Sequence, residues 1–378
     1  MLKKKILIVT ERRADYSKFR PIIKEIEQSA KLDYFLIVTG SHLLKEYGQT
    51  IRDIEKDGFK ITAKFQMYAK QKGDTGREMV SALGKSIVHL SKFVEQLKPD
   101  IILSGFDIGA NFAAAIVGAH MNKVVVHIEG GEVSGTIDDP IRHATTRFAH
   151  IHCVTNSTAA TRLVRMGENP KNVYVTGAPG LDEICKIKLF DRDTLIKKYG
   201  LENGKDFVLF LFHPDGTNYD SLKEKTLIII EAILEKKFQL IAFYPNSDSG
   251  GLAISEALKT YENKITLVIH AEREEFLSLV SESIVLIGNS SCGIIEAASL
   301  GTLVINLGQR QFLRERSSNV TDISIKENEI KDALEKIECS KKQSFKNIYG
   351  DGKASERIVK LLSNIDLSSK STSKINVY

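Results

Sequence analysis

KILIVTERRADYSKF, residues 5–19, is the stretch from which the fold can be inferred. An apolar, β-branched run is followed at once by a charged loop, and then by a segment with helical period. The pattern predicts a buried strand, a functional loop at its carboxyl end and a helix. The apolar run covers only residues 6–9 before polar residues return, so it indicates a first strand and not a secretory signal.

The same unit recurs along the chain, because short β-branched runs alternate with longer segments of helical period. This alternation predicts open parallel sheets with helices on both faces, the doubly wound α/β class. The further strands that we expect are DYFLIVT (33–39), IILSG (101–105), VVVHI (124–128), IHCVT (151–155), NVYVTG (172–177), FVLFLF (207–212), QLIAFY (239–244), ITLVI (265–269), IVLIG (284–288) and LVINL (303–307).

The length of the chain and the position of its turn residues predict two Rossmann-like domains. A chain of 378 residues exceeds the size at which one hydrophobic core usually stops growing. Gly177, Pro179 and Gly180 mark a turn between the two sets of strands. We therefore expect domains at 1–180 and 181–365, a flexible tail at 366–378, and an active-site cleft between the carboxyl ends of both strand sets.

Composition excludes several classes of protein. The 53 basic and 48 acidic residues give a net charge of +5, and the lysines are scattered, which argues against a nucleic-acid partner. No segment approaches the roughly 18 apolar residues of a membrane span. The cysteines have no CxxC spacing, which predicts reduced thiols in a cytoplasmic protein and no structural zinc. They are Cys153, Cys185, Cys292 and Cys339.

The second half contains a candidate phosphate site. GNSSCGIIEAA, residues 288–298, follows an expected strand and opens a helix at Ser290 and Ser291. Unpaired backbone N–H groups at such an end attract anions, and Glu296, about two turns further on, could accept hydrogen bonds from a ribose. The alternative is that Asn289 and Ser290 only cap an ordinary helix.

Polar side chains also follow other strands of both halves. Arginines at such loops could clamp a pyrophosphate through their planar guanidinium groups, and a histidine could transfer a proton or bind phosphate. The alternatives are solvated arginines and structural histidines. These candidates are Arg12, Arg13, His42, His213, Arg310, Arg314 and Arg316.

Acidic residues concentrate in HIEGGEVSGTIDDPIRH, residues 127–143. His127 and Glu129 end one expected strand, and Asp107 follows another. Crowded carboxylates have their pKa values pushed apart, so that one can act as a base while another holds a proton. Asp138 and Asp139 would also stabilise the positive end of a helix that carries Pro140 near its start, and both roles are compatible.

The motifs HIEGGEVSGTIDDPIRHA, IGNSSCGIIEAASLGTLVINLGQRQ, RADYSKF, GSHLLKEYG and IYGDG occur in matching order between residue 5 and about residue 365. Together they resemble the hydrolysing UDP-N-acetylglucosamine 2-epimerases of bacterial sialic acid synthesis and the epimerase domain of the bifunctional animal enzyme. The resemblance implies a glycosyltransferase-B type fold with UDP in the cleft between the two domains, UDP binding by the second domain, and a dimer or a dimer of dimers. It implies no nicotinamide and no metal.

The resemblance also implies a reaction and residue roles. The sugar loses its C2 proton while UDP leaves C1, and water then adds to the resulting 2-acetamidoglucal, which yields N-acetylmannosamine and UDP. Asp107, Glu129 and Asp138 are then acid–base residues, with His213 close to the reacting sugar or its phosphates. The expected UDP and sugar contacts are Arg13, His42, His127, Asn246, Ser290, Ser291, Glu296 and Arg310.

One stretch departs from the family pattern. Where members commonly have a histidine before Gly-Asp-Arg or a similar sequence, this chain has GFDI at 105–108, so Gly105 and Ile108 replace the histidine and the arginine. A UDP- or GDP-linked 2,4-diacetamido-trideoxy sugar, as in legionaminic acid-type pathways, would suit the apolar change. A non-hydrolysing epimerase, a glycosyltransferase of the same fold and a non-catalytic nucleotide-sugar binding protein are also compatible with the sequence.

Overall fold

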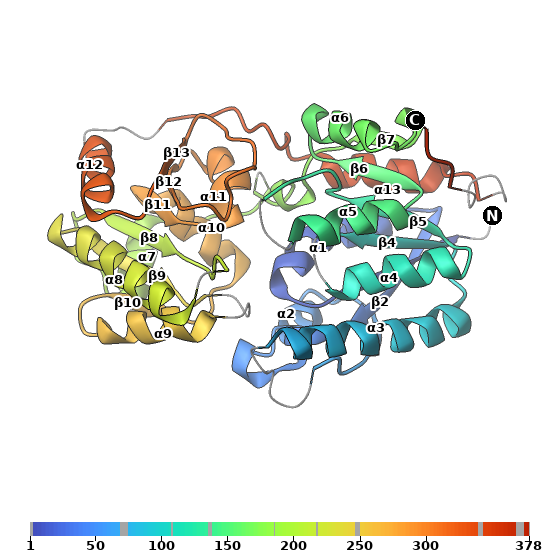
Figure 1. Cartoon of the computed structure of the whole chain (residues 1–378), viewed down its shortest axis with the longest axis horizontal. Helices are drawn as coiled ribbons and strands as arrows, with labels where there is room; N and C mark the ends of the chain where they lie inside the picture. Colours follow the sequence, from blue (N-terminus) through green and yellow to red (C-terminus); the bar gives the residue numbers. More distant parts are fainter. Residues whose placement is uncertain are drawn as a thin grey trace. The chain divides into compact units, whose positions relative to one another are not determined.

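The computed structural model describes residues 3–68, 75–106, 109–134, 138–184, 186–216, 218–245, 250–338, 343–367 and 374–377. The chain forms two compact units. The first comprises Met1–Val133, Ile137–Glu183 and Tyr349–Tyr378, and the second comprises Ser134–Thr136 and Ile184–Ile348. Each unit is an α/β structure around a parallel sheet, as the alternating pattern predicts (Figure 1).

The sheet of the first unit has seven strands in the order β3-β2-β1-β4-β5-β6-β7. All of its strand pairs are parallel. The carboxyl ends of its strands therefore share one edge, and the loops that follow them gather there. The strands are β1 (Lys4–Thr10), β2 (Leu32–Val38), β3 (Ile61–Lys64), β4 (Ile101–Gly105), β5 (Val124–Ile128), β6 (Ile151–Val154) and β7 (Val173–Val175).

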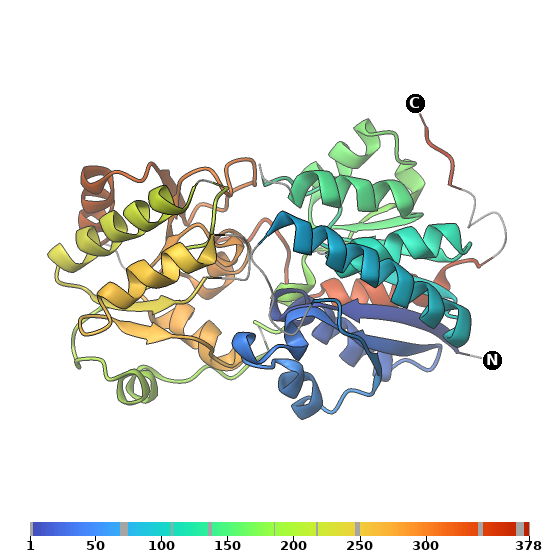
Figure 2. The same cartoon turned by 60° about the horizontal axis from the view of Figure 1, so that its bottom comes forward.

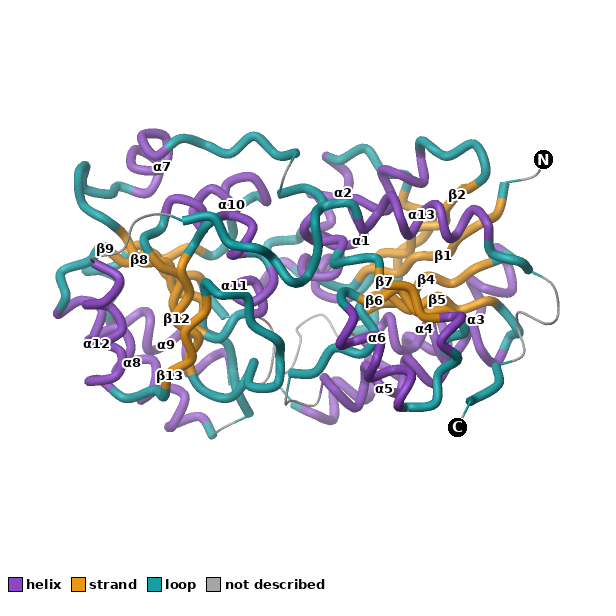
Figure 3. The backbone as a smooth tube through the Cα atoms, turned by 90° about the horizontal axis from the view of Figure 1, so that it is seen from above, coloured by secondary structure: helices purple, strands orange, loops and turns teal. Residues whose placement is uncertain are grey.

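Helices lie on both faces of this sheet (Figure 3). They are α1 (Arg13–Glu27), α2 (Ile51–Lys56), α3 (Gly76–Leu97), α4 (Gly109–His120), α5 (Asp138–Phe148), α6 (Ser157–Arg165) and α13 (Ala354–Asn364). Short 3-10 turns occur at η1 (Gly40–Leu43), η2 (Lys45–Tyr47), η3 (Pro170–Asn172) and η4 (Pro179–Leu181).

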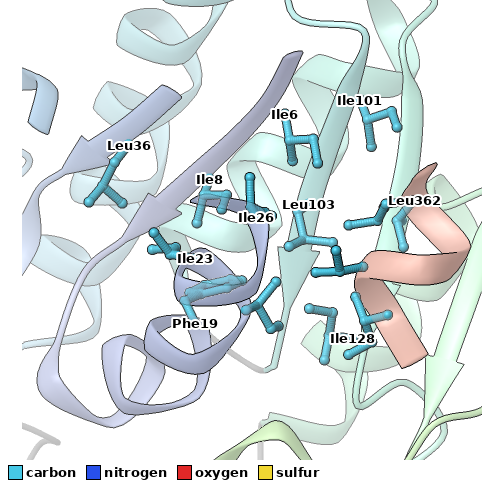
Figure 4. Close-up of a cluster of buried hydrophobic side chains, with 14 of the residues drawn as sticks. Ile6, Ile8, Phe19, Ile23, Ile26, Leu36, Ile101, Leu103, Ile128 and Leu362 are labelled. Atoms are coloured by element: carbon cyan, nitrogen blue, oxygen red, sulfur yellow. The ribbon is translucent and has the colours of Figure 1, made fainter. Parts of the chain in front are cut away.

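Strand β1 shows why both faces must be covered. Its side chains alternate between faces, and each of the four residues 6–9 is buried. Ile6 and Ile8 pack in one core with Phe19 of α1 and Leu362 of α13 (Figure 4). The two residues in between, Leu7 and Val9, belong to a second core that α3 and α4 line on the opposite face. The apolar run of the opening motif is thus the fully buried part of β1.

The carboxyl-terminal helix corrects the expected domain boundary. The sequence predicts a second domain that extends to residue 365, but the chain returns to the first unit at Tyr349 (Figure 1). There α13 packs against α1, and the carboxylate of Asp182 accepts hydrogen bonds from the backbone N–H groups of Ala354 and Ser355. The apolar face of α13 completes the core around β1. The helix therefore belongs to the first unit because of its packing, although it follows the second unit in the chain.

The second unit repeats the architecture with six parallel strands in the order β10-β9-β8-β11-β12-β13. Val208 and Phe210 of the central strand pack with α8, α9 and α12 in one core. Its strands are β8 (Phe207–Leu211), β9 (Gln239–Phe243), β10 (Thr266–Val268), β11 (Val285–Gly288), β12 (Leu303–Leu307) and β13 (Val320–Ile323). Its helices are α7 (Arg192–Tyr199), α8 (Tyr219–Glu235), α9 (Gly251–Thr260), α10 (Arg273–Glu282), α11 (Ser291–Ile295), η5 (Ala297–Leu300) and α12 (Glu327–Glu338).

Two edge strands were missed by the sequence prediction, because neither contains a long apolar run. β3 is half-buried and β13 has two exposed residues, Thr321 and Asp322. Each pairs with one neighbour only, so tertiary pairing more than composition makes it a strand. Among the described residues, no helix is both long and apolar enough to cross a membrane.

The end of the chain also differs from the expected tail. Residues 374–377 contact the first unit: the ammonium group of Lys374 donates to the carbonyl oxygens of Thr146 and Ala149 and to the carboxylate of Glu168. The backbone N–H of Val377 donates to the carbonyl of Gly167. This part of the expected flexible tail therefore has specific partners.

Candidate active site

Glu129 is the acid whose surroundings are most distinctive in the first unit. It follows β5 with a left-handed backbone (φ 57°), a conformation that costs a non-glycine residue free energy, and its side chain is buried. One carboxylate oxygen, Oε2, accepts from the ammonium group of Lys18 at 2.5 Å. The other oxygen, Oε1, is buried and has no hydrogen-bond partner within the described part of the chain.

Lys18, the partner of Glu129, is a residue of this candidate site that sequence reasoning missed. It lies on α1, where its ammonium group also stands 4.4 Å from the centre of the Phe106 ring. The quoted RADYSKF motif contains Lys18, but no spacing pattern connects a residue on α1 to the loop after β5. Only the parallel order of β1, β4 and β5 brings them together.

Two buried acids organise the loop after β1, and sequence reasoning missed both. The Glu11 carboxylate accepts from the Tyr68 hydroxyl at 2.6 Å and from the backbone N–H of Ala110 at 2.9 Å. Asp15 accepts from the Thr10 hydroxyl and from the backbone N–H groups of Glu11 and Arg12. Burial raises the pKa of Asp15 to about 6, with Glu11 nearby adding to the increase. Glu11 thereby holds the start of α4, which directly follows the segment of Asp107.

The histidines expected to contact substrate in the first unit are both buried. His42 bonds the hydroxyl of Thr10 through Nε2 at 2.9 Å and that of Thr50 through Nδ1 at 2.7 Å. Burial lowers its pKa to about 3. Since both ring nitrogens are occupied, His42 supports the loop, and the expectation of a direct ligand contact is corrected on this geometry.

His127 lies within β5 and is likewise inaccessible. Its Nδ1 pairs with the Thr146 hydroxyl at 3.1 Å, and burial lowers the pKa of the ring well below its ordinary value. Within the described residues, its Nε2 has no partner. The ring is buried, and its Nδ1 contacts Thr146 of α5. The geometry therefore does not support the expected direct contact of His127 with a ligand.

Helix α5 begins at the acidic pair, as predicted. Asp138 is a half-buried residue of its first turn, where the helix dipole stabilises a negative charge. The neighbouring Asp139 forms an ion pair with the buried guanidinium of Arg142 at 2.8 Å, and Arg142 also donates to the carbonyl of Glu132. Pro140 is the third helical residue. Asp139 is therefore structural, while Asp138 stays the candidate for acid–base work.

Arg13 is the half-buried first residue of α1, and Arg12 is its N-cap. Asp107 and Asn246 lie outside the described residues, as do Cys185 and Cys339. Cys153 and Cys292 are free cysteines. Within the described chain, no group of three or more His, Cys, Asp and Glu residues could hold a metal ion.

In the second unit, Asn289 connects three strand ends. Its Oδ1 accepts from the backbone N–H of His213 at 2.7 Å, and its Nδ2 donates to the His213 carbonyl at 2.8 Å. The carbonyl of Asn289 in turn accepts from the guanidinium of Arg310 at 3.1 Å and from the Gln311 amide at 3.2 Å. The loops after β8, β11 and β12 thus meet at one residue, which sequence reasoning treated only as a possible cap.

Gly288 permits this junction. Its φ is +145°, and a Cβ there would lie 2.0 Å from the carbonyl oxygen of Leu211. Only glycine accepts both the conformation and the close approach. The glycine that begins GNSSCG is therefore required by the backbone next to β8.

The serines and Glu296 lie near this junction, but the expected helix is shorter. Ser290 is the N-cap of α11, and its hydroxyl accepts from the backbone N–H of Cys292 at 3.4 Å. Because α11 ends at Ile295 and a 3-10 turn follows, Glu296 caps the helix and does not lie two turns inside it. Its carboxylate forms an ion pair with Arg273. Burial, reinforced by Glu296, raises the pKa of Cys292 well above its usual value.

Two parallel-sheet units with polar loops at their carboxyl edges define an α/β protein with two Rossmann-like domains of the glycosyltransferase-B type. A family model described as UDP-N-acetylglucosamine 2-epimerase matches residues 24–363. The chain therefore belongs to the UDP-N-acetylglucosamine 2-epimerase family.

Two relatives and one solved structure refine the comparison. The chain is 39% identical over 377 residues to the UDP-N,N'-diacetylbacillosamine 2-epimerase (hydrolyzing) of Legionella pneumophila, covering 99% of this chain and 100% of that protein. It is 33% identical over 338 residues to the UDP-N-acetylglucosamine 2-epimerase of Neisseria meningitidis serogroup B, covering 89% and 88%. The structure of UDP-GlcNAc 2-epimerase from Neisseria meningitidis bound to UDP-GlcNAc shares the fold, with a TM-score of 0.79 at 20% identity over 95% and 99% of the chains.

Proposed function

We propose that this protein is a hydrolysing 2-epimerase of a UDP-linked 2-acetamido sugar. A base removes the C2 proton while the C1–O bond to UDP breaks, which leaves a C1=C2 double bond. Water then adds its oxygen to C1, and a proton reaches C2 from the other face. The balance is one UDP-sugar and one water giving one free epimerised sugar and one UDP, so no redox cofactor is needed.

The observation that carries this proposal is the state of Glu129. A buried carboxylate with one oxygen on Lys18 and the other without a described partner is arranged for proton transfer, and backbone strain at its Cα is typical of functional positions. We assign Glu129, Asp107 and Asp138 to the proton transfers at C2 and at the added water. Because the proton leaves one face of C2 and returns to the other, these transfers need a base on one face and an acid on the other.

We propose that the junction at Asn289 binds the nucleotide. Ser290, Ser291, Glu296 and Arg310 are the proposed UDP contacts of the second unit, with His213 beside the phosphates. Arg13 would supply a further cation from the first unit, and Asn246 remains a proposed contact. A cation at the pyrophosphate stabilises the negative charge that UDP acquires as it leaves. We propose that the loops at the carboxyl edges of both sheets contact the same substrate molecule.

For the sugar we propose a 2,4-diacetamido-trideoxy substrate of the N,N'-diacetylbacillosamine type. Two observations support it. The relative of that activity matches 99% of this chain at 39% identity, and Gly105 and Ile108 replace a donor and a cation that a hydroxyl-rich sugar would use. UDP-N-acetylglucosamine, giving N-acetylmannosamine for sialic acid-type synthesis, is the second candidate, and the family description and the Neisseria relative support it. A GDP-linked substrate is a further alternative.

Proton NMR in deuterated water tests the reaction and the substrate together. Each UDP-sugar is incubated with the purified protein, and the expected products are free UDP and a free sugar with deuterium at C2, formed faster from the diacetamido substrate. Release of a UDP-linked epimer would instead indicate the non-hydrolysing reaction. UDP binding without turnover of either sugar would indicate a binding protein and overturn the proposal.

We also propose that the protein acts in the cytoplasm and as a homodimer or homotetramer. The free thiols of Cys153 and Cys292 are consistent with a reducing compartment.

A further inference from the structure

Two residues of the first unit have left-handed backbones at neighbouring strand ends. Phe106 directly follows β4 with a φ of 69°, and Glu129 directly follows β5 with a φ of 57°. Since β4 and β5 pair in parallel, both residues lie at the same edge of the sheet. Glycine adopts this conformation without cost, whereas a phenylalanine or a glutamate is strained in it. Strain of this kind is concentrated at positions where a side chain has a function.

The side chains of these two residues meet at one cation. The ammonium group of Lys18 lies over the Phe106 ring, 4.4 Å from its centre, and 2.5 Å from Oε2 of Glu129. The π electrons of an aromatic face attract a cation, and they do so more strongly where water is excluded. Phe106 is only 4% exposed. Lys18 is therefore held from two sides, by a ring and by a carboxylate.

Phe106 is fixed in place by contacts of its own. Its backbone N–H donates at 3.3 Å to the carbonyl of Ile128, the residue directly before Glu129. Its ring meets the ring of Phe19, the neighbour of Lys18 on α1, with the centres 5.2 Å apart and the planes inclined by 66°. The backbone of Phe106 is thus bound to the strand of Glu129, and its ring is packed on the helix of Lys18.

The helix that carries Lys18 is itself anchored. The buried residues of α1 pack in one core with β1 and α13. In Figure 2, the orange-red helix α13 lies next to the blue amino-terminal segments of the first unit. Because the helix is fixed, only the lysine side chain can vary the place of the ammonium group. A lysine has a long, flexible stem, and a second contact besides the carboxylate restricts it.

We propose that Phe106 is a positioning residue for the proposed reaction. Its ring holds the ammonium group of Lys18 on Oε2 of Glu129, which leaves Oε1 as the oxygen that transfers the proton. The inference rests on the proposed function, in which Glu129 takes part in proton transfer at C2. Phe106 acts through Lys18, and the part of its side chain that matters is the π face and not the volume.

The turnover number of two kinds of variant tests the role of the π face. Phe106→Leu keeps an apolar side chain and removes the aromatic face, so kcat should fall about tenfold or more, because small displacements of a reacting group are costly. KM and UDP affinity should stay unchanged. Mono-, di- and trifluorinated phenylalanine, incorporated at position 106, keep the ring and weaken its negative face, so kcat should fall stepwise with each fluorine.

Phe59→Leu is the matched control. Phe59 is a buried aromatic residue of the same core, and its ring packs edge-on against that of Tyr16. The loss of packing volume is the same as in Phe106→Leu. We expect kcat of Phe59→Leu to equal that of the wild type, so that a lower kcat in Phe106→Leu cannot be a general effect of a smaller core residue.

A double-mutant cycle with Lys18→Met tests whether Phe106 acts through Lys18. In the Lys18→Met background the cation is absent, and Phe106→Leu should change kcat by less than about twofold. The same cycle is measured in urea on the equilibrium constant of unfolding. There the two residues should be coupled by about threefold or more, as expected for a shielded cation–π pair.

Three outcomes are decisive. A wild-type kcat in Phe106→Leu, or a loss that is equal in both backgrounds, would overturn the positioning role. An absence of coupling in the unfolding cycle would do the same, because the contact would then have no energetic weight. The unfolding cycle needs no turnover: coupling in a wild type that turns over no UDP-sugar would refute the proposed function, and the positioning role with it, while confirming the contact.

Discussion

The ammonium group of Lys18 lies 2.5 Å from a carboxylate oxygen of Glu129, although 111 residues separate them in the chain. The Glu129 side chain is 5% exposed and that of Lys18 is 22% exposed, so the pair is well shielded from solvent. Removing one partner of such a pair leaves the other charge poorly solvated, which makes both residues informative to mutate.

Glu129→Gln keeps the size of the side chain and removes its proton-transfer ability. We expect turnover of the UDP-sugar to fall by about 10² to 10⁴, the usual contribution of general acid–base catalysis. UDP affinity, measured by calorimetry, should be unchanged, because the proposed nucleotide contacts are mainly in the second unit. Retained wild-type turnover would remove Glu129 from the mechanism.

Lys18→Met keeps the aliphatic contact with Phe106 and removes the ammonium group. The unpaired Glu129 carboxylate should lower the free energy of unfolding by about 1–3 kcal/mol and turnover by at least about tenfold. The control is Lys24→Met on the same helix. It breaks an ion pair with Glu183, but Lys24 is more exposed than Lys18. Equal effects of both variants on turnover would contradict a special role for Lys18.

Asn289→Ala removes the two hydrogen bonds to His213. We expect a loss of about 1–3 kcal/mol in the free energy of unfolding and a weaker affinity for UDP, since the loops after β8 and β12 lose their common anchor. Asn319→Ala is the control. Asn319, which directly precedes β13, is also buried, and its amide donates to the carbonyl of Thr302, away from the junction. Chemical denaturation and calorimetry measure the two effects, and unchanged UDP binding in Asn289→Ala would contradict the proposed nucleotide site.

His42 should make stability depend on pH. Its pKa is about 3 in the folded chain and near 6.5 when exposed, so only the unfolded state gains a proton as the pH falls between these values. The contribution of neutral His42 is therefore complete above about pH 6.5 and decreases by up to about 1.4 kcal/mol per pH unit below it.

The measurement compares wild type with His42→Gln in urea unfolding at several pH values. The stability difference between them should be largest near neutral pH and shrink on acidification. His120→Gln, at an exposed histidine at the end of α4, is the control for losing an imidazole. A difference that stays constant with pH would show that His42 does not titrate in this way.

Lys374→Met tests whether the end of the chain stabilises the first unit. Its ammonium group bonds two carbonyls and Glu168, whose carboxylate also pairs with His152 at 3.0 Å. We expect the free energy of unfolding to fall by about 1–3 kcal/mol, as for lost hydrogen bonds to a charged group. Lys360→Met, at an exposed position of α13, should have almost no effect. A truly flexible tail would give the same null result for both variants.

Local patterns in the sequence were sufficient to predict the two parallel sheets and most of their strands. Buried parallel strands need continuous β-branched and apolar runs. The run that includes Ile6 and Ile8 meets this requirement, and it can be recognised from neighbouring residues alone. The position of Glu129 after β5, and that of Ser290 at a helix start, also follow from local patterns, because each lies where a strand or a helix begins or ends.

Contacts between residues that are far apart in the sequence depend on long-range packing. No local sequence pattern predicts them. Lys18 and Glu129, or His213 and Asn289, come together because strand order in a sheet differs from order in the sequence. The same holds for α13, whose apolar face packs against α1 although it follows every strand of the second unit. His42 and His127 show the converse: their positions at strand ends indicated ligand contacts, but burial and threonine partners, which depend on distant segments, made them structural.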